Sequence, residues 1–196
     1  MPSLADELSR TEAERACLAE VRRLTGATAG PLEHHNVRAF LIGERLAERR
    51  GLRIDREVLL CAAHLHDAGL YPGAASDASY VEDGARLAQR LLAPYGWPRA
   101  RLKRCADAIE RHHELRAQWK RGVEVELLRR ADQVDISGGL VDFGAGRGWV
   151  RSLGREAPRR GFYREIARLL ARVTRDRPHT LPRIFRPGRG RTRPTR

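Results

Sequence analysis

A histidine and an aspartate, His66 and Asp67, stand side by side at the end of an apolar run that begins at Val58. Polar and charged side chains are rarely buried unless they are paired with a partner or bind a metal ion. Imidazole nitrogens and carboxylate oxygens are ligands of divalent transition metals such as Mn²⁺, Fe²⁺, Co²⁺, Ni²⁺ and Zn²⁺. The pair therefore indicates a metal site beside the end of a helix.

Three further places supply the same kinds of group, each in a segment that reads as a helix: Glu33-His34-His35, Arg111-His112-His113 and Ala131-Asp132-Gln133. In chain order the four elements are His, then His-Asp, then His-His, then Asp. This order resembles the HD superfamily of metal-dependent hydrolases, over roughly residues 31 to 136. The superfamily's pattern His-x-x-Arg places its first histidine on His35, because Arg38 follows at the right offset. His34 is the alternative.

The resemblance implies that the metal ligands are His35, His66, Asp67 and Asp132. The last of these has an alternative, because Asp135 follows Asp132 by three residues and would lie on a similar face of the same helix. Two histidines and two carboxylates on one six-coordinate ion would leave two positions for water and substrate. Such an ion lowers the pKa of a bound water towards about 7.

The resemblance also implies catalytic roles for three residues. Asp67 would accept a proton from the attacking water, and His112 would bind or protonate the leaving group. Arg38 would bind phosphoryl oxygens through its planar fork of donors. His113 is about 100° further round the helix than His112 and is expected to face elsewhere.

The number of metal ions is predicted from a missing histidine. Members of the superfamily that bind two metals carry a further histidine in the segment after the His-Asp pair. This chain has no histidine between residues 67 and 112, and Tyr80 stands in its place. We therefore expect one divalent transition metal ion, of Mn, Fe, Co, Ni or Zn, and no structural zinc site, since no thiolate ligands accompany the cluster.

Three functions compete on these motifs. The first is a phosphohydrolase that acts on a nucleotide or another small phosphate ester. The second is hydration of a small nitrile, because His66-Asp-Ala-Gly-Leu70 followed by Tyr80-Val-Glu-Asp-Gly-Ala85 looks like the cyanamide hydratase branch, with Leu70 where a lysine is often found. The third is a non-catalytic module that binds a metal or a ligand. We favour the phosphohydrolase.

Helical periodicity is the pattern that positions these residues, and no segment alternates as a strand would. We expect one all-α domain of about six to eight helices over residues 1–174. The expected helices cover residues 3–25, 31–50, 55–69, 80–93, 98–115, 123–136 and 162–173. The loops at 70–79 and 137–161 are expected to hold substrate specificity. His64 is two positions before His66, about 200° round the helix, and is interpreted as a packed structural histidine.

The net charge of +13 is concentrated towards the C-terminus, where residues 175–196 hold eight arginines against one acid. The prolines and glycines there predict a disordered tail. Such an arm can bind nucleic acid. Arginine outnumbers lysine throughout the chain, however, which indicates a composition bias and not selection for a binding surface. A solvated tail is therefore the preferred interpretation.

Three cysteines without a CxxC pair suit a reducing cytoplasm, and no apolar run is long enough to span a membrane. No leader segment is recognisable at the N-terminus. We expect a cytoplasmic protein whose partner is a small-molecule substrate, with homo-oligomerisation left open.

Overall fold

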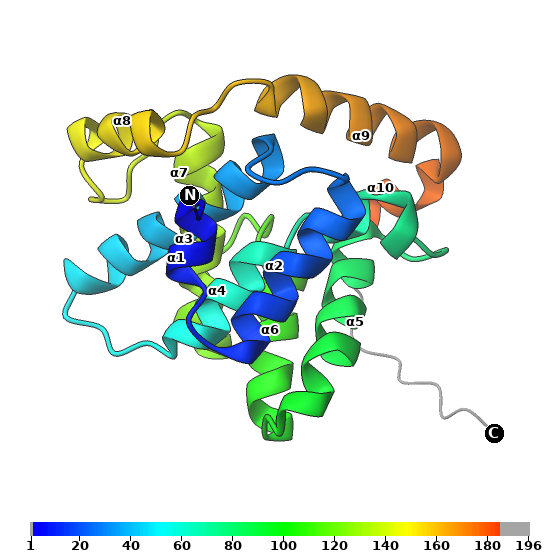
Figure 1. The fold of residues 1–196 in the computed structure, drawn as a ribbon, viewed down its shortest axis with the longest axis horizontal. Coiled ribbons are helices and arrows are strands. Elements are labelled where there is room, and N and C mark those ends of the chain that lie inside the picture. The colour runs from blue at the N-terminus through cyan, green and yellow to red at the C-terminus, as the bar shows by residue number, and fades with distance from the viewer. Residues whose placement is uncertain (1, 185–196) are drawn as a thin grey trace.

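The computed structural model describes residues 2–184, and over that range helices form the fold without any strand, as the periodicity predicts (Figure 1). The helices are α1 (Leu4–Leu8), α2 (Glu12–Thr25), α3 (Pro31–Glu48), α4 (Arg56–Leu65), α5 (Tyr80–Leu92), α6 (Arg99–Arg111), α7 (Val123–Ile136), α8 (Arg147–Glu156), α9 (Phe162–Asp176) and α10 (Leu181–Ile184). None of the helices in this part of the chain combines the length and apolar character needed to cross a membrane.

Helix α4 is the centre of the domain. Asp55 caps its first turn by accepting a hydrogen bond from the backbone of Val58, and every residue from Val58 to Leu65 is buried. Helices α2, α3, α5, α6 and α7 all pack against it. The apolar run therefore serves as the core of the fold, and its last turn delivers His66 to the interior.

The helix expected over residues 3–25 is two helices, so that prediction was wrong. Ser3 caps α1 in a capping box with Asp6, and Thr11 starts α2 with a second capping box that uses Glu14. Between them the Ser9 hydroxyl donates to the carbonyl of Ala5, which closes the end of α1. A second capping box within one apolar stretch ends the first helix and starts a new one.

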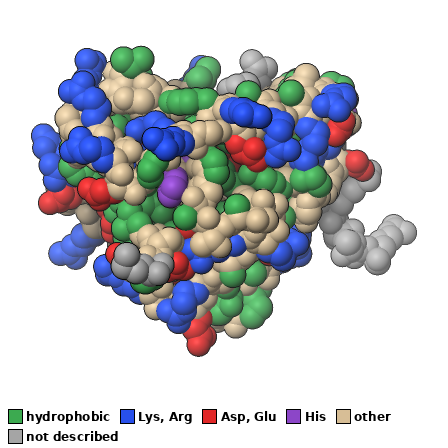
Figure 2. All heavy atoms as spheres, turned by 45° about the horizontal axis from the view of Figure 1, so that its top comes forward, with side chains coloured by type: hydrophobic (Ala, Val, Ile, Leu, Met, Phe, Trp, Pro, Cys, Tyr) green, Lys and Arg blue, Asp and Glu red, His purple; other side chains and the backbone are tan. Residues whose placement is uncertain are grey.

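The segment 137–161, expected to be a loop, contains α8. Gly138, Gly139, Gly144 and Gly146 adopt positive φ and form the turns that precede it. Helix α9 then continues to Asp176, beyond the expected domain boundary at residue 174, and residues 178–184 form further short helices. The first part of the predicted tail is thus helical, and its remainder, residues 185–196, lies outside the described residues. Figure 2 shows the face that α8 and α9 cover.

A close backbone contact holds α5 against the turn that follows α4. A Cβ added at Gly69 would overlap the carbonyl oxygen of Tyr80 and would lie 2.9 Å from the backbone nitrogen of Gly84. Gly84 in turn sits close to the carbonyl oxygen of Leu65. Glycine is required at Gly69 because backbone, and not a flexible side chain, occupies the space.

We therefore expect Gly69→Ala to lower the free energy of unfolding by about 3 kcal/mol, since the new methyl group forces α5 away from the turn. Chemical denaturation with circular dichroism measures this change. Gly148→Ala is the matched control: its added Cβ meets no atom within 4 Å, and alanine favours the helix. Equal stability of the two variants would contradict the close packing described here.

Candidate metal centre

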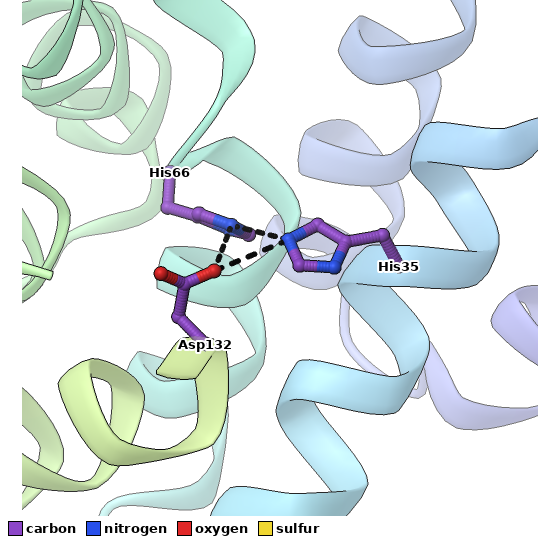
Figure 3. Close-up of side chains that lie close together, drawn as sticks. All are labelled: His35, His66 and Asp132. Carbon is purple, nitrogen blue, oxygen red and sulfur yellow. Dashed lines mark hydrogen bonds and ion pairs between the residues drawn. The ribbon is translucent and has the colours of Figure 1, made fainter. Parts of the chain in front are cut away.

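Helices α3, α4, α6 and α7 bring the predicted site residues to one buried place. His35 comes from α3, His66 from the C-cap of α4, and Asp132 from α7, and Figure 3 shows their polar atoms turned towards one another. Asp67 follows His66 at the start of a short 3-10 turn, and His112 caps the end of α6. Each of these five residues is at most 5 % exposed.

The three buried histidines share one orientation. The Nδ1 atom of His35 donates to Asp135 Oδ2 at 2.7 Å, that of His66 to the carbonyl of Ala63 at 2.9 Å, and that of His112 to the carbonyl of Ile109 at 2.6 Å. An acceptor at Nδ1 places the proton there and leaves the lone pair on Nε2. All three Nε2 atoms therefore face the same interior space, where each can bind a proton or a positive ion.

The distance between two of these nitrogens tests whether a cation fits. His35 Nε2 and His66 Nε2 are 2.9 Å apart, so a proton or a positive ion must lie between them. Two nitrogens bound at about 2.1 Å and at right angles to one ion would be about 3.0 Å apart. The observed separation matches that arrangement.

The carboxylates give the same result. Asp132 Oδ1 lies 3.4 Å from His35 Nε2 and 3.8 Å from His66 Nε2, and neither oxygen of Asp132 has a hydrogen-bond partner. Asp67 Oδ2 lies 3.7 Å and 3.5 Å from the same two nitrogens. A buried carboxylate without donors is costly unless a cation neutralises it. The donor set therefore fits a divalent metal ion.

The possible ligands fall into three overlapping groups whose atoms lie within 4.8 Å of one another: His35 with His66 and Asp132; His66 with Asp67 and His112; and His112 with His113 and Asp132. The predicted ligands all belong to this set. His112, expected only to contact the leaving group, thus lies among the candidate ligands, with its Nε2 3.7 Å from Asp67 Oδ1.

Burial and neighbouring charges determine how these groups ionise. Burial alone lowers the pKa of His35, but Asp132 and Asp135 outweigh it and raise that pKa to about 9. Burial lowers the pKa of His66, and it lowers that of His112 well below the usual value, with further effects from nearby histidines. A neutral His112 suits an acceptor or a ligand better than a proton donor.

Arg38 does not face substrate space, so the role predicted for it needs correction. Its side chain is fully buried, and its Nε and Nη2 donate to the two oxygens of Asp135 at 2.8 Å each. Its Nη1 donates to the carbonyls of Ala157 and Pro158. Every nitrogen of the guanidinium is therefore engaged, and Arg38 fixes Asp135, which in turn orients His35. Asp135, the alternative ligand, therefore orients a candidate ligand and does not itself belong to the cluster.

His113 is a site residue that the sequence interpretation missed. Its Nδ1 lies 3.6 Å from Asp132 Oδ2, and its Nε2 contacts the hydroxyl of buried Tyr80. The expectation that His113 faces elsewhere assumed that the helix continues, but α6 ends at Arg111 and the chain turns there. Tyr80 thus reaches the cluster through His113.

Two further histidines, His64 and His34, are not among the candidate ligands. His64 is buried on the opposite side of α4, where its Nε2 lies 3.3 Å from the hydroxyl of Ser9, and burial lowers its pKa to about 4. These contacts agree with a packed structural histidine. His34 is half-buried beside the cluster's outer wall, and burial and Arg38 lower its pKa. The structure places His35, and not His34, among the ligand candidates.

Helix α9 covers the cluster from outside. The Phe162 ring stacks on His35 with ring centroids 4.3 Å apart. The hydroxyl of Tyr71 donates to Glu165, and Arg172 donates to the carbonyl of Leu70. These contacts join α9 to the segment that follows the His-Asp pair, and they account for the burial of the ligands.

Comparison with known proteins agrees with this geometry. A family model described as HD domain matches residues 32–137, which is more than half of the chain and includes every candidate ligand described above. No curated protein matches the chain.

Proposed function

Because this chain belongs to the HD domain family, we propose that it is a metal-dependent hydrolase that cleaves a small phosphate ester, with a nucleotide as the first candidate. One observation carries the proposal: three histidine Nε2 atoms and two carboxylates face a single buried space, and Asp132 has no hydrogen-bond donor there. A single divalent transition metal ion, held by His35, His66, Asp67 and Asp132, would satisfy them.

A divalent ion held there would lower the pKa of a water molecule and polarise the ester. The chain's own residues would do the rest. Asp67 lies between the histidines with little exposure and would accept the proton of the attacking water. His112 would accept a hydrogen bond through its unpartnered Nε2 and so orient that water. Burial excludes bulk water, which strengthens these interactions.

Arg159, and not Arg38, is the residue whose guanidinium would bind a phosphorylated substrate. Its Nη2 donates to Asp135 Oδ1 at 2.5 Å, but its side chain is 22 % exposed and its Nε has no hydrogen-bond partner. Asp135 already receives both donors of Arg38, so Arg159 contributes a positive charge beyond what that carboxylate neutralises. A phosphoryl group is a suitable partner for such a guanidinium.

Hydration of a small nitrile is the second candidate. The observation in its favour is that Leu70 is buried next to the His-Asp turn, and Arg38 is fully committed to Asp135. A site with few unpaired positively charged side chains suits a small uncharged substrate. The substrate charge therefore separates the two proposals.

We expect protein loaded with Mn²⁺, Co²⁺, Ni²⁺ or Zn²⁺ to release phosphate from nucleoside monophosphates, while metal-free protein does not. Asp67→Asn is expected to lower kcat/KM on the order of 10³-fold, because it removes the proton acceptor. The measurement is phosphate release across a panel of nucleotides, sugar phosphates and nitrophenyl phosphates, run beside urea formation from cyanamide and amide formation from small nitriles.

Asp77→Asn is the matched control, since Asp77 is exposed and makes no hydrogen bond or ion pair within the described residues. Its activity should equal that of the wild type. Turnover of nitriles without phosphate release would replace the first proposal by the second. No turnover of either class by metal-loaded protein would favour a non-catalytic binding module.

A further inference from the structure

The net charge of the protein is confined to its last quarter. Residues 1–146 contain 22 basic and 22 acidic residues, so they are balanced. Residues 147–177, which form α8, α9 and the turn between them, contain ten arginines and three acids, a net charge of +7. A composition bias towards arginine would not leave one segment balanced and the next strongly basic. The excess therefore calls for an explanation specific to α8 and α9.

These arginines lie at helical spacing. On α8 they recur every four residues, and on α9 Arg164, Arg168 and Arg175 fall within about 40° of one another around the axis. We call the exposed set the α8–α9 arginine surface; it comprises Arg147, Arg151, Arg155, Arg160, Arg164, Arg168 and Arg175.

The opposite faces of both helices are buried. Val150 and Leu153 anchor α8, and Phe162, Leu169 and Val173 anchor α9. Both helices lie along the same side of the molecule (Figure 1), and basic side chains gather along the upper part of the face in Figure 2, where these helices lie. The arginine side chains are therefore presented outwards by two firmly packed helices.

Most of this surface is not neutralised by the protein itself. Arg168 pairs with Glu165, and Arg147 donates to the carbonyl of Leu140. Within the described residues no hydrogen bond or ion pair is made by the other five: Arg151, Arg155, Arg160, Arg164 and Arg175. Their guanidinium groups are free to bind an extended anion.

We propose that the α8–α9 arginine surface binds the phosphate backbone of a nucleic acid without sequence preference. The donors are spread along α9, about 22 Å long, and do not converge on one point, which suits a chain of phosphates better than a small anion. Residues 147–177 contain no asparagine or glutamine, so side chains that read adenine in a groove are missing. This binding does not depend on the proposed hydrolase activity.

The test is fluorescence anisotropy of the full chain with a short DNA duplex and a short single-stranded RNA, both of mixed sequence. We expect affinity to fall steeply between about 50 and 200 mM salt, with a slope of about −0.9 in log K against log salt for each duplex phosphate contact. A fourfold variant, Arg151→Gln with Arg155→Gln, Arg160→Gln and Arg164→Gln, should bind at least about tenfold more weakly and flatten that slope by about 2 or more.

The control variant replaces four exposed arginines in the balanced part of the chain: Arg49→Gln, Arg53→Gln, Arg90→Gln and Arg99→Gln. None of these four side chains makes a hydrogen bond or ion pair within the described residues. Its affinity should stay within about twofold of the wild type. Circular dichroism melting of both variants checks that they fold alike.

Three results would overturn the proposal: no binding of either nucleic acid by the wild type, equal losses in the two fourfold variants, or equally tight binding of a poly-glutamate peptide. A fourth would do so as well. If the α8–α9 variant binds normally while Arg186→Gln with Arg189→Gln, Arg191→Gln and Arg193→Gln abolishes binding, the contact belongs to residues outside the described range.

Discussion

Replacing Asp132 by asparagine is expected to abolish stoichiometric metal binding. Asp132 is buried, its two oxygens have no hydrogen-bond donor, and it lies against the Nε2 atoms of His35 and His66. Asparagine keeps the shape but removes the charge that neutralises the ion. We expect elemental analysis to find about one transition metal per wild-type chain and a small fraction of that in Asp132→Asn.

Thermal melting provides a second readout of the same change. A ligand present at 1,000 times its Kd stabilises the folded state by about 4.1 kcal/mol, so added metal should raise the Tm of the wild type and not that of Asp132→Asn. Asp77→Asn is again the control and should behave as the wild type. Normal metal content in Asp132→Asn would exclude the proposed ligand set and direct attention to Asp135. Near two ions per chain would contradict a single-metal site.

The pH dependence of metal binding has a defined sign. The pKa of His35 is raised to about 9 in the protein without metal, so at neutral pH its Nε2 carries a proton that an ion must displace. Affinity should therefore rise as pH increases to about 9 and level off above it. Isothermal titration in buffers of different ionisation enthalpy would count the released proton.

Arg38→Met is expected to lower the free energy of unfolding by about 3 to 5 kcal/mol. The side chain is fully buried, and its loss leaves the Asp135 carboxylate without two of its donors and the carbonyls of Ala157 and Pro158 without theirs. Urea denaturation of the metal-free protein measures the change without interference from metal binding. Arg49→Met, at an exposed residue without partners, should alter stability by less than about 0.5 kcal/mol.

A double-mutant cycle separates this positioning role from a substrate contact. If Arg38 acts through Asp135, then Arg38→Met combined with Asp135→Leu should be less destabilised than the sum of the single variants, because the double variant has no buried Asp135 carboxylate that lacks the donors of Arg38. A fully stable Arg38→Met protein with a raised KM for a phosphorylated substrate would restore the role first predicted for Arg38.

Much of the fold was readable from local signals. The helix expected from residue 31 begins at Pro31, and those expected near residues 80 and 123 begin at Tyr80 and Val123. Proline in a first turn, glycine after a last one and apolar periodicity act within a few residues, so sequence alone reports them. The capping box from Thr11 to Glu14 was equally visible and would have divided the first expected helix correctly.

The parts that were missed depend on contacts between distant segments. Arg38 and Asp135 are 97 residues apart, and nothing in the neighbourhood of either indicates that the other will bind it. His113 was misplaced because its direction depends on where α6 ends. Arg159 enters the site only because α8, which was taken for a loop, brings it next to Asp135. Local pattern identified the candidate ligands, whereas the residues that orient them emerge only from tertiary packing.

The enclosure of the cluster beneath Phe162 and α9 has a kinetic consequence. With the candidate ligand residues at most 5 % exposed, a chelator or a substrate cannot collide with them in the state described here. Exchange must wait for transient separation of α9 from the residues that follow the His-Asp pair. The residence time of a bound ion or substrate is then set by the frequency of that opening. Above some chelator concentration, adding more chelator should no longer accelerate release of the ion.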